Sequence, residues 1–164
     1  MSVQNRNQTV EWCRQPQSHI TLDNRLLQFD PPVRGIYGIF IKDKGQKKCV
    51  YVGKAENLYN RMFKSDGHIV NIKKGIHFNS QLKQALEQGQ EIIIEVLEEV
   101  PYNKGDCSIE NYNRDMQSLA FAEYKQINSY QNKGECLWQL PEGKHLSFDE
   151  WCKKKEVLMD NERE

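Results

Sequence analysis

The sequence predicts an α+β fold in which a small three-stranded antiparallel sheet is flanked by helices, with helical extensions at the N- and C-termini. Two neighbouring runs rich in β-branched and aromatic residues, GIYGIFI from Gly35 and CVYVG from Cys49, predict a hairpin of buried strands joined by a polar turn around Gly45. A third apolar run, EIIIEVLEEV, ends before Pro101 and predicts the remaining strand. Apolar residues at helical spacing lie between and after these runs.

The chain of 164 residues suits one central domain, predicted over residues 33–140, because a chain of this size buries about 70% of its unfolded surface. Residues 1–32 are predicted to form an N-terminal extension with a short helix around Val10–Arg14, closed by Pro31 and Pro32. Residues 141–164 are predicted to form a C-terminal helical extension that opens on the capping box at 147–150.

Two helices are predicted between the hairpin and the third strand. Asn57 caps the first helix, in which Leu58 and Met62 share one face. Asn79 caps the second helix, and Gly89 ends it.

The segment after the third strand divides into a loop and a helix. The polar, Asn-rich stretch 102–114 predicts the loop. Helical spacing then returns through Leu119, Ala122 and Ile127, on a helix that carries Glu123.

The charge balance excludes a strongly basic nucleic-acid binder. The chain has 23 basic and 23 acidic side chains, so its net charge is zero. A local basic groove is still compatible with this balance. The basic runs at 44–48, 71–75 and 152–155 are typical of solvated faces, but the first two flank the residues singled out below. We expect phosphate contacts there, with Lys73 and Lys74 as the candidates.

Cysteine and histidine usage argues against a disulfide framework and a zinc site. The five cysteines are odd in number and show no CxxC spacing, which favours reduced thiols. Three histidines, His19, His77 and His145, have no metal-ligand spacing between them. No stretch approaches the roughly 20 apolar residues of a membrane span, and the N-terminus lacks a signal peptide's apolar core. We therefore expect a cytoplasmic protein.

The hairpin region carries a two-part motif. The first part is Gly35-Ile-Tyr-Gly, and the second is Tyr51-Val-Gly-Lys-Ala-Glu-Asn-Leu-Tyr-Asn-Arg61. Together they closely resemble the signature of the GIY-YIG nucleases, and the second part is nearest to the nuclease domain of the bacterial excinuclease C subunit. The resemblance covers roughly residues 33–139, because the third strand and a Glu-bearing helix follow in the family's order. It implies a metal-dependent DNA endonuclease of GIY-YIG fold.

The resemblance also implies roles for individual residues. Tyr37 would orient or deprotonate the attacking water beside Tyr51, and Arg61 would stabilise the scissile phosphate. Glu123 would be the only protein ligand of a Mg²⁺ or Mn²⁺ ion, whose shell is completed by water and phosphate oxygens. Lys54 would add positive charge at the site, because a phenol with a pKa near ~10 needs cations to act as a base. Gly53 would let the backbone turn closely beside the substrate.

Each of these residues also has a structural interpretation. Tyr37 and Tyr51 could be strand core residues, although their joint placement beside Gly35 and Gly53 favours the site. Arg61 on a solvated helix face is the alternative for that residue. Glu123, as a helical glutamate, is most often a surface or ion-pair residue.

The chain departs from the family pattern at two positions. Many members place His or Tyr one helical turn after the arginine, where this chain has Ser65. His68 is a substitute acid or base, and an exposed loop histidine is the equal alternative. The family's later Asn falls on Glu135, so Asn132 is the nearest candidate for a phosphate contact, with a helix-end cap as the alternative for it and for Gln131.

Two functions from different classes remain after this comparison of residues. The leading hypothesis is a stand-alone DNA endonuclease in a restriction, repair or mobile-element setting, and symmetric cutting of both strands would suggest a homodimer. The alternative is a catalytically inactive nucleic-acid-binding or interaction module that keeps the fold. Retention of Tyr37, Tyr51, Arg61 and Glu123 favours the nuclease.

Overall fold

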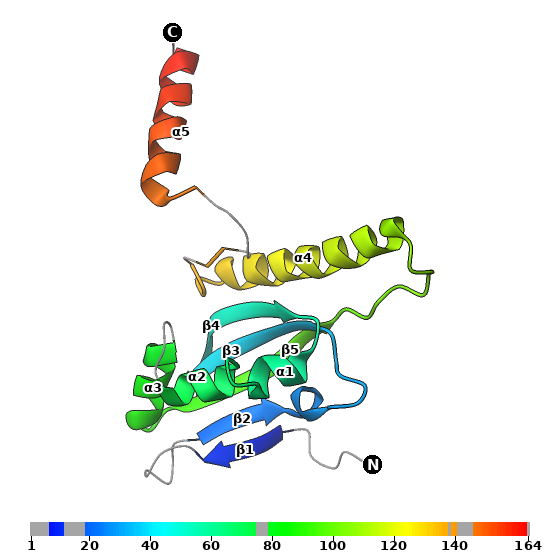
Figure 1. Cartoon of the computed structure of the whole chain (residues 1–164). Coiled ribbons are helices and arrows are strands. Elements are labelled where there is room, and N and C mark those ends of the chain that lie inside the picture. Colours follow the sequence, from blue (N-terminus) through cyan, green and yellow to red (C-terminus); the bar gives the residue numbers. More distant parts are fainter. Residues whose placement is uncertain (1–6, 12–18, 75–78, 138, 141–145, 164) are drawn as a thin grey trace.

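A five-stranded mixed sheet with helices on both of its faces forms the body of the protein, seen here in a computed structural model. The structure describes residues 7–11, 19–74, 79–137, 139–140 and 146–163. The strand order is β1-β2-β5-β3-β4, so β4 and β1 are the two edge strands (Figure 1). The α+β class predicted from the sequence is confirmed.

The elements follow one another along the chain with short connections. Their bounds are β1 Asn7–Glu11, β2 His19–Asp23, the 3₁₀ helix η1 Asn24–Leu27, β3 Gly35–Asp43, β4 Gln46–Ala55, α1 Leu58–Phe63, α2 His68–Lys74, α3 Asn79–Glu87, β5 Glu91–Glu99, α4 Ile109–Gln131 and α5 Phe148–Arg163.

The predicted hairpin is formed by β3 and β4, which pair antiparallel from Gly35 opposite Ala55 to Asp43 opposite Gln46. Lys44 and Gly45 both have positive φ, at 52° and 82°, as a tight two-residue hairpin turn requires. On its other side β3 pairs antiparallel with β5, so the three predicted strands form the middle and one edge of the sheet.

The prediction of only three strands is wrong, because β1 and β2 extend the same sheet. β2 lies parallel to β5, with Ile20 opposite Ile92, and β1 pairs antiparallel with β2. Val10 therefore lies in a strand and not in the short helix predicted around Val10–Arg14; the end of that range lies outside the described residues. In β2, buried Ile20 and Leu22 flank the half-buried Thr21, an alternation with the period of a strand.

The loop predicted over residues 102–114 is shorter than expected. Ser108 caps α4, because its hydroxyl accepts a hydrogen bond from the backbone N–H of Asn111 at 3.3 Å. The first turns of α4 are largely exposed, which leaves no apolar stripe in the sequence to announce them.

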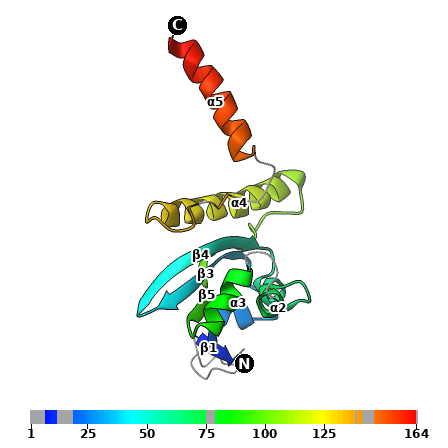
Figure 2. The same ribbon diagram turned by 90° about the vertical axis from the view of Figure 1, so that its left-hand side faces the viewer.

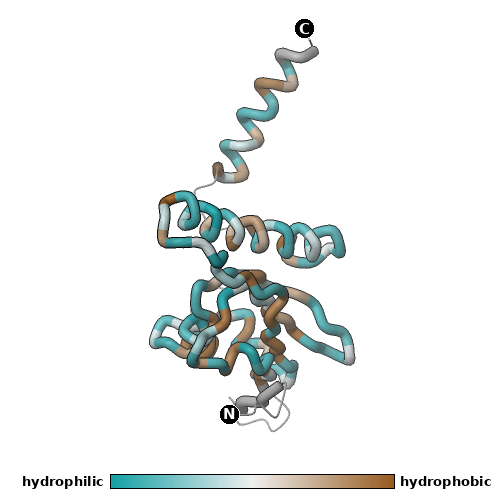
Figure 3. Tube along the Cα trace, turned by 90° about the vertical axis from the view of Figure 1, so that its right-hand side faces the viewer, coloured by the Kyte–Doolittle hydropathy of each residue, from teal (hydrophilic) through white to brown (hydrophobic). Residues whose placement is uncertain are grey.

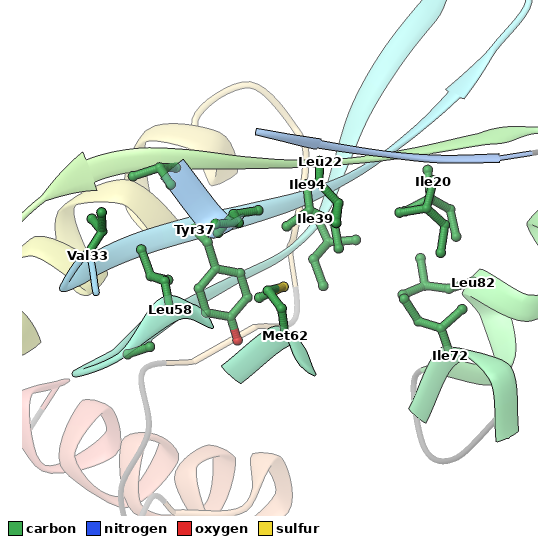
Figure 4. Packing of buried hydrophobic residues seen from close by; sticks show 14 of the residues in the cluster. Ile20, Leu22, Val33, Tyr37, Ile39, Leu58, Met62, Ile72, Leu82 and Ile94 are labelled. Atoms are coloured by element: carbon green, nitrogen blue, oxygen red, sulfur yellow. The ribbon is translucent and has the colours of Figure 1, made fainter. Parts of the chain in front are cut away.

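Two hydrophobic cores lie on opposite faces of the sheet. Successive side chains of a strand point to opposite faces, so Tyr37 and Ile39 join one core while Ile36 and Phe40 join the other. The first core fills the space between the sheet and helices α1, α2 and α3, and Figure 4 shows its packing. The second core lies under α4, which crosses the other side of the sheet (Figure 2).

The C-terminal helix α5 stands away from the sheet (Figures 1 and 3). Its predicted start is confirmed, because the Ser147 hydroxyl accepts a hydrogen bond from the backbone N–H of Glu150 at 3.2 Å. Figure 3 shows hydrophilic and hydrophobic residues alternating along this helix. Among the described residues, no helix is both long and apolar enough to cross a membrane.

Asp23 joins β2 to β5 through its carboxylate, which is 8% exposed as a residue. It accepts hydrogen bonds from the backbone N–H of Val96 at 3.1 Å and from Nη2 of Arg25 at 2.9 Å. Burial, the largest single influence, raises the pKa of Asp23, but the hydrogen bonds from Arg25 and Val96 together hold that pKa below its ordinary value of 3.8.

We expect this carboxylate to make stability depend on acid pH. Since the pKa of Asp23 is lower in the folded state, its contribution is present above about pH 4 and is lost as the pH falls through the folded pKa. Asp23→Asn should lower the free energy of unfolding at pH 7 by about 1–2 kcal/mol and flatten its decline below pH 4. Urea unfolding at several pH values measures this, with the exposed Asp43→Asn as control. Parallel pH profiles for the wild type and Asp23→Asn would contradict the assignment.

Candidate active site

Tyr37 is the centre of the candidate site and lies on β3, entirely shielded from solvent. Its cross-strand partner on β4 is Gly53. A Cβ atom at Gly53 would come closer than 3.0 Å to three atoms of the Tyr37 ring and hydroxyl. Gly53 therefore provides the space in which the phenol lies, and Figure 4 shows the ring beside Leu58 and Met62.

We expect Gly53→Ala to displace the Tyr37 phenol and to lose activity together with about 1–3 kcal/mol of stability, as overpacked cores do. Gly45→Ala is the matched control, because a Cβ there meets no atom within 4 Å. It should cost about 1–2 kcal/mol for its left-handed backbone and keep full activity. Thermal unfolding and plasmid cleavage measure the two effects. An active Gly53→Ala would show that the phenol tolerates displacement.

The Tyr37 hydroxyl lies between two nitrogen groups. Nε of Arg61 donates a hydrogen bond to it at 3.2 Å, and Nε2 of His68 lies 2.6 Å from it. Because Arg61 occupies an acceptor position of the oxygen, the phenol proton is available to donate to His68. The Tyr51 ring completes the group, with its centroid 6.1 Å from that of Tyr37 and 5.6 Å from that of His68.

The local folds of α1 and α2 place these two nitrogen groups. Asn57 caps α1 by accepting a hydrogen bond from the backbone N–H of Asn60 at 3.0 Å, which puts Arg61 in the last turn of the helix. Gly67 then brings the chain so close to Met62 that a Cβ would meet its carbonyl oxygen at 2.6 Å. The chain turns at this point directly into α2, which begins with His68.

His68 is only 1% exposed, so the alternative of an exposed loop histidine is wrong. Ser65, at the position where many family members have His or Tyr, is exposed in the connection between α1 and α2. The sequence signal for His68 was its place shortly after the arginine; its contact with Tyr37 depends on the fold of the turn.

The surroundings of Tyr37 oppose its ionisation. Burial is the largest cause that raises its pKa well above 10.0, and the neighbouring Tyr51 raises it further. The positive charge and hydrogen bond of Arg61 act in the opposite direction but do not reverse the shift. The phenol therefore keeps its proton near neutral pH unless a neighbouring group accepts it.

Glu123 is 1% exposed on α4, among residues of the second hydrophobic core such as Ala122 and Ile127. It thus projects from the helix that covers the sheet face opposite to the side chain of Tyr37. Within the described ranges, no group of three or more His, Cys, Asp or Glu side chains is placed to hold a metal. A single carboxylate fits Mg²⁺ as one hard oxygen ligand among waters and phosphate oxygens.

The remaining predicted residues lie outside the group around Tyr37. Lys54 is half-buried on β4 opposite Ile36, and strand alternation puts it on the α4 side of the sheet. Lys74 is exposed at the end of α2, roughly 9 Å along the helix from His68. The Lys73 side chain lies outside the described residues, as does His77.

Asn132 has the helix-end role that was its alternative. It is exposed and is the C-cap of α4, with its backbone N–H donating to the carbonyl of Asn128 at 3.0 Å. Gln131 connects the following turn, because its Nε2 donates to the backbone carbonyls of Cys136 at 2.9 Å and Gln139 at 2.7 Å.

The segment after α4 covers the free edge of β4, which the sequence did not indicate. We call residues 132–137 and 139–140 the edge segment. Oε1 of Glu135 accepts a hydrogen bond from the backbone N–H of Cys49 at 2.5 Å, and Oε1 of Gln139 accepts one from Val52 at 2.9 Å. Nε2 of Gln139 also donates to the carbonyl of Val52. These contacts flank Tyr51.

Comparisons with protein-family models, with curated proteins and with solved structures find no match to this chain.

Proposed function

We propose that this protein is a metal-dependent endonuclease that hydrolyses phosphodiester bonds in DNA by GIY-YIG-type chemistry. The observation that carries the proposal is the Tyr37 hydroxyl, held between Arg61 and His68 with Tyr51 beside it. Three of these four residues belong to the two-part motif of the sequence.

The contacts support a proton relay. His68 Nε2 is placed to accept the Tyr37 proton at 2.6 Å, which would let the phenol oxygen take a proton from an attacking water. Arg61 carries a fixed positive charge at the same oxygen, and this charge would also neutralise a phosphate in the transition state. The relay answers the raised pKa of Tyr37, because the proton passes on to imidazole and no free phenolate has to persist.

The divalent ion, Mg²⁺ or Mn²⁺, would be bound by the Glu123 carboxylate. When bound, it would supply positive charge to the phosphate and stabilise the leaving oxygen. Lys54, on the same side of the sheet as α4, would add charge toward the DNA backbone. Lys73 and Lys74 would make further phosphate contacts, and a homodimer would serve symmetric cutting of both strands. A cytoplasmic location is part of this proposal.

The second candidate is a nucleic-acid-binding or interaction module without catalysis. The burial of both Tyr37 and Glu123 favours it, because neither side chain has more than 1% exposure to the solvent that delivers DNA and metal. A nuclease requires that DNA binding or movement of the chain opens the site.

Plasmid cleavage distinguishes the two candidates. We expect supercoiled plasmid to be nicked or linearised with Mg²⁺ or Mn²⁺ and to remain intact with EDTA. Glu123→Ala should lower the metal-dependent rate by roughly tenfold or more, since a metal site loses its protein ligand.

The control is Glu110→Ala, an exposed glutamate in the first turn of the same helix, which should cleave like the wild type. Equal activity of Glu123→Ala and the wild type would refute the metal role. Absence of cleavage on plasmid, genomic and branched DNA, together with retained DNA binding, would favour the second candidate.

A further inference from the structure

Two cysteines meet where the edge segment crosses β4. Sγ of Cys136 lies 3.3 Å from the backbone carbonyl oxygen of Cys49, and the two thiols are within hydrogen-bonding contact of each other. They lie 87 residues apart in the sequence. Glu135, the neighbour of Cys136, holds the Cys49 backbone N–H at the same point, so the approach of the two residues is fixed on both sides.

We propose that Cys49 and Cys136 form a dithiol site that is reversibly oxidised to an intramolecular disulfide by a low-molecular-weight disulfide such as oxidised glutathione. The site is separate from the nuclease chemistry and does not depend on the proposed function. It would covalently attach the edge segment to β4.

The two thiols differ in a way that gives them separate roles. Cys49 is buried, whereas Cys136 is half-buried and therefore the more accessible sulfur. The hydrogen bond from the Cys49 thiol lowers the pKa of Cys136, and this is the largest influence on it. The same contact raises the pKa of Cys49, and burial raises it further. Cys136 is thus the thiol that ionises first and attacks.

The oxidation proceeds in two exchange steps. The Cys136 thiolate attacks one sulfur of glutathione disulfide, forming a mixed disulfide and releasing one glutathione thiolate. Cys136 then no longer carries charge, which removes the largest influence that raised the pKa of Cys49. The Cys49 thiolate attacks Sγ of Cys136 and displaces the second glutathione. Two cysteine thiols are oxidised, one glutathione disulfide becomes two thiols, and the two protons pass to the released thiolates.

The test uses the full chain equilibrated in glutathione buffers of increasing oxidised fraction, followed by thiol blocking and non-reducing peptide mass spectrometry. We expect a Cys49–Cys136 cross-linked peptide and the loss of two free thiols. The disulfide should raise Tm by roughly 5–15 °C, because it closes a long loop in the unfolded chain.

Matched serine variants assign the two roles. A variant with Cys13, Cys107 and Cys152 changed to Ser should still form the cross-link. Cys49→Ser should instead accumulate glutathione on Cys136, and Cys136→Ser should leave Cys49 unmodified. Circular dichroism of the reduced variants shows whether each one is folded.

Three outcomes would overturn the proposal. One is glutathione on Cys136 of the wild type without any cross-link. The second is a cross-link that requires one of the other three cysteines. The third is a cross-link that forms only in urea, which would mean that the folded chain keeps the two sulfurs apart.

Discussion

Replacing Tyr37 by Phe is expected to lower the rate of DNA cleavage by about 10²–10⁴-fold while the protein stays folded, the range lost when a positioned acid or base is removed. The substitution deletes one oxygen atom and keeps the ring that fills the first hydrophobic core. Both Nε of Arg61 and Nε2 of His68 lose their contact with that oxygen. The proton relay is then interrupted, whereas the surface that meets DNA is unchanged.

The rate is measured on plasmid under single-turnover conditions, and the affinity for uncleaved DNA is measured with EDTA present. Tyr112→Phe is the matched control, because this tyrosine of α4 is 58% exposed and the variant should cleave like the wild type. A Tyr37→Phe rate within threefold of the wild type would remove Tyr37 from the chemistry. Tyr51 would then be the tyrosine to test.

Replacing Arg34 by Ala is expected to lower the free energy of unfolding by about 3–5 kcal/mol, the cost of breaking a buried ion pair by removing one partner. Arg34 is 5% exposed, and its Nε donates to Oε2 of Glu56 at 2.6 Å. Its Nη1 and Nη2 donate to the carbonyls of Val100 at 2.8 Å and Asp115 at 2.7 Å. The Tyr102 ring stacks on the guanidinium, with 4.4 Å from Cζ to the ring centroid.

These contacts explain the size of the expected loss. Arg34 precedes β3 and binds the chain after β4, the end of β5 and the early part of α4, so one side chain joins three parts of the domain. Lys47→Ala is the control, because its pair with Glu95 at 2.9 Å is 40% and 35% exposed at the two side chains. It should cost at most about 1 kcal/mol. Equal losses for the two variants in urea unfolding would contradict the role of burial.

The site residues in the contiguous motif were predictable from sequence, because their spacing follows directly from a hairpin and the helix after it. Tyr37, Tyr51 and Arg61 do lie together. His68 was one of two open alternatives, because its orientation depends on the turn at Gly67, which no periodic pattern describes. Glu123 was placed on the correct helix, but its near-complete burial was not foreseen.

The fold was predictable where apolar residues repeat over many positions, as in β3, β4, β5 and the later part of α4. The two N-terminal strands were missed because each has only five residues, too few to separate strand from helix spacing. The side chains of Glu135 and Gln139 bond to a strand more than 80 residues earlier. Such contacts between a polar side chain and a distant backbone leave no pattern in the sequence.

The contacts of Glu135 and Gln139 also bear on how the protein behaves at high concentration. An edge strand with unpaired backbone groups is a template on which a neighbouring molecule can add a strand, and this is a common start of aggregation. Here side chains, and not another strand, occupy the backbone groups of Cys49 and Val52. The segment that follows α4 therefore contributes to solubility, and its removal would endanger storage of the protein before it affected the fold of the sheet.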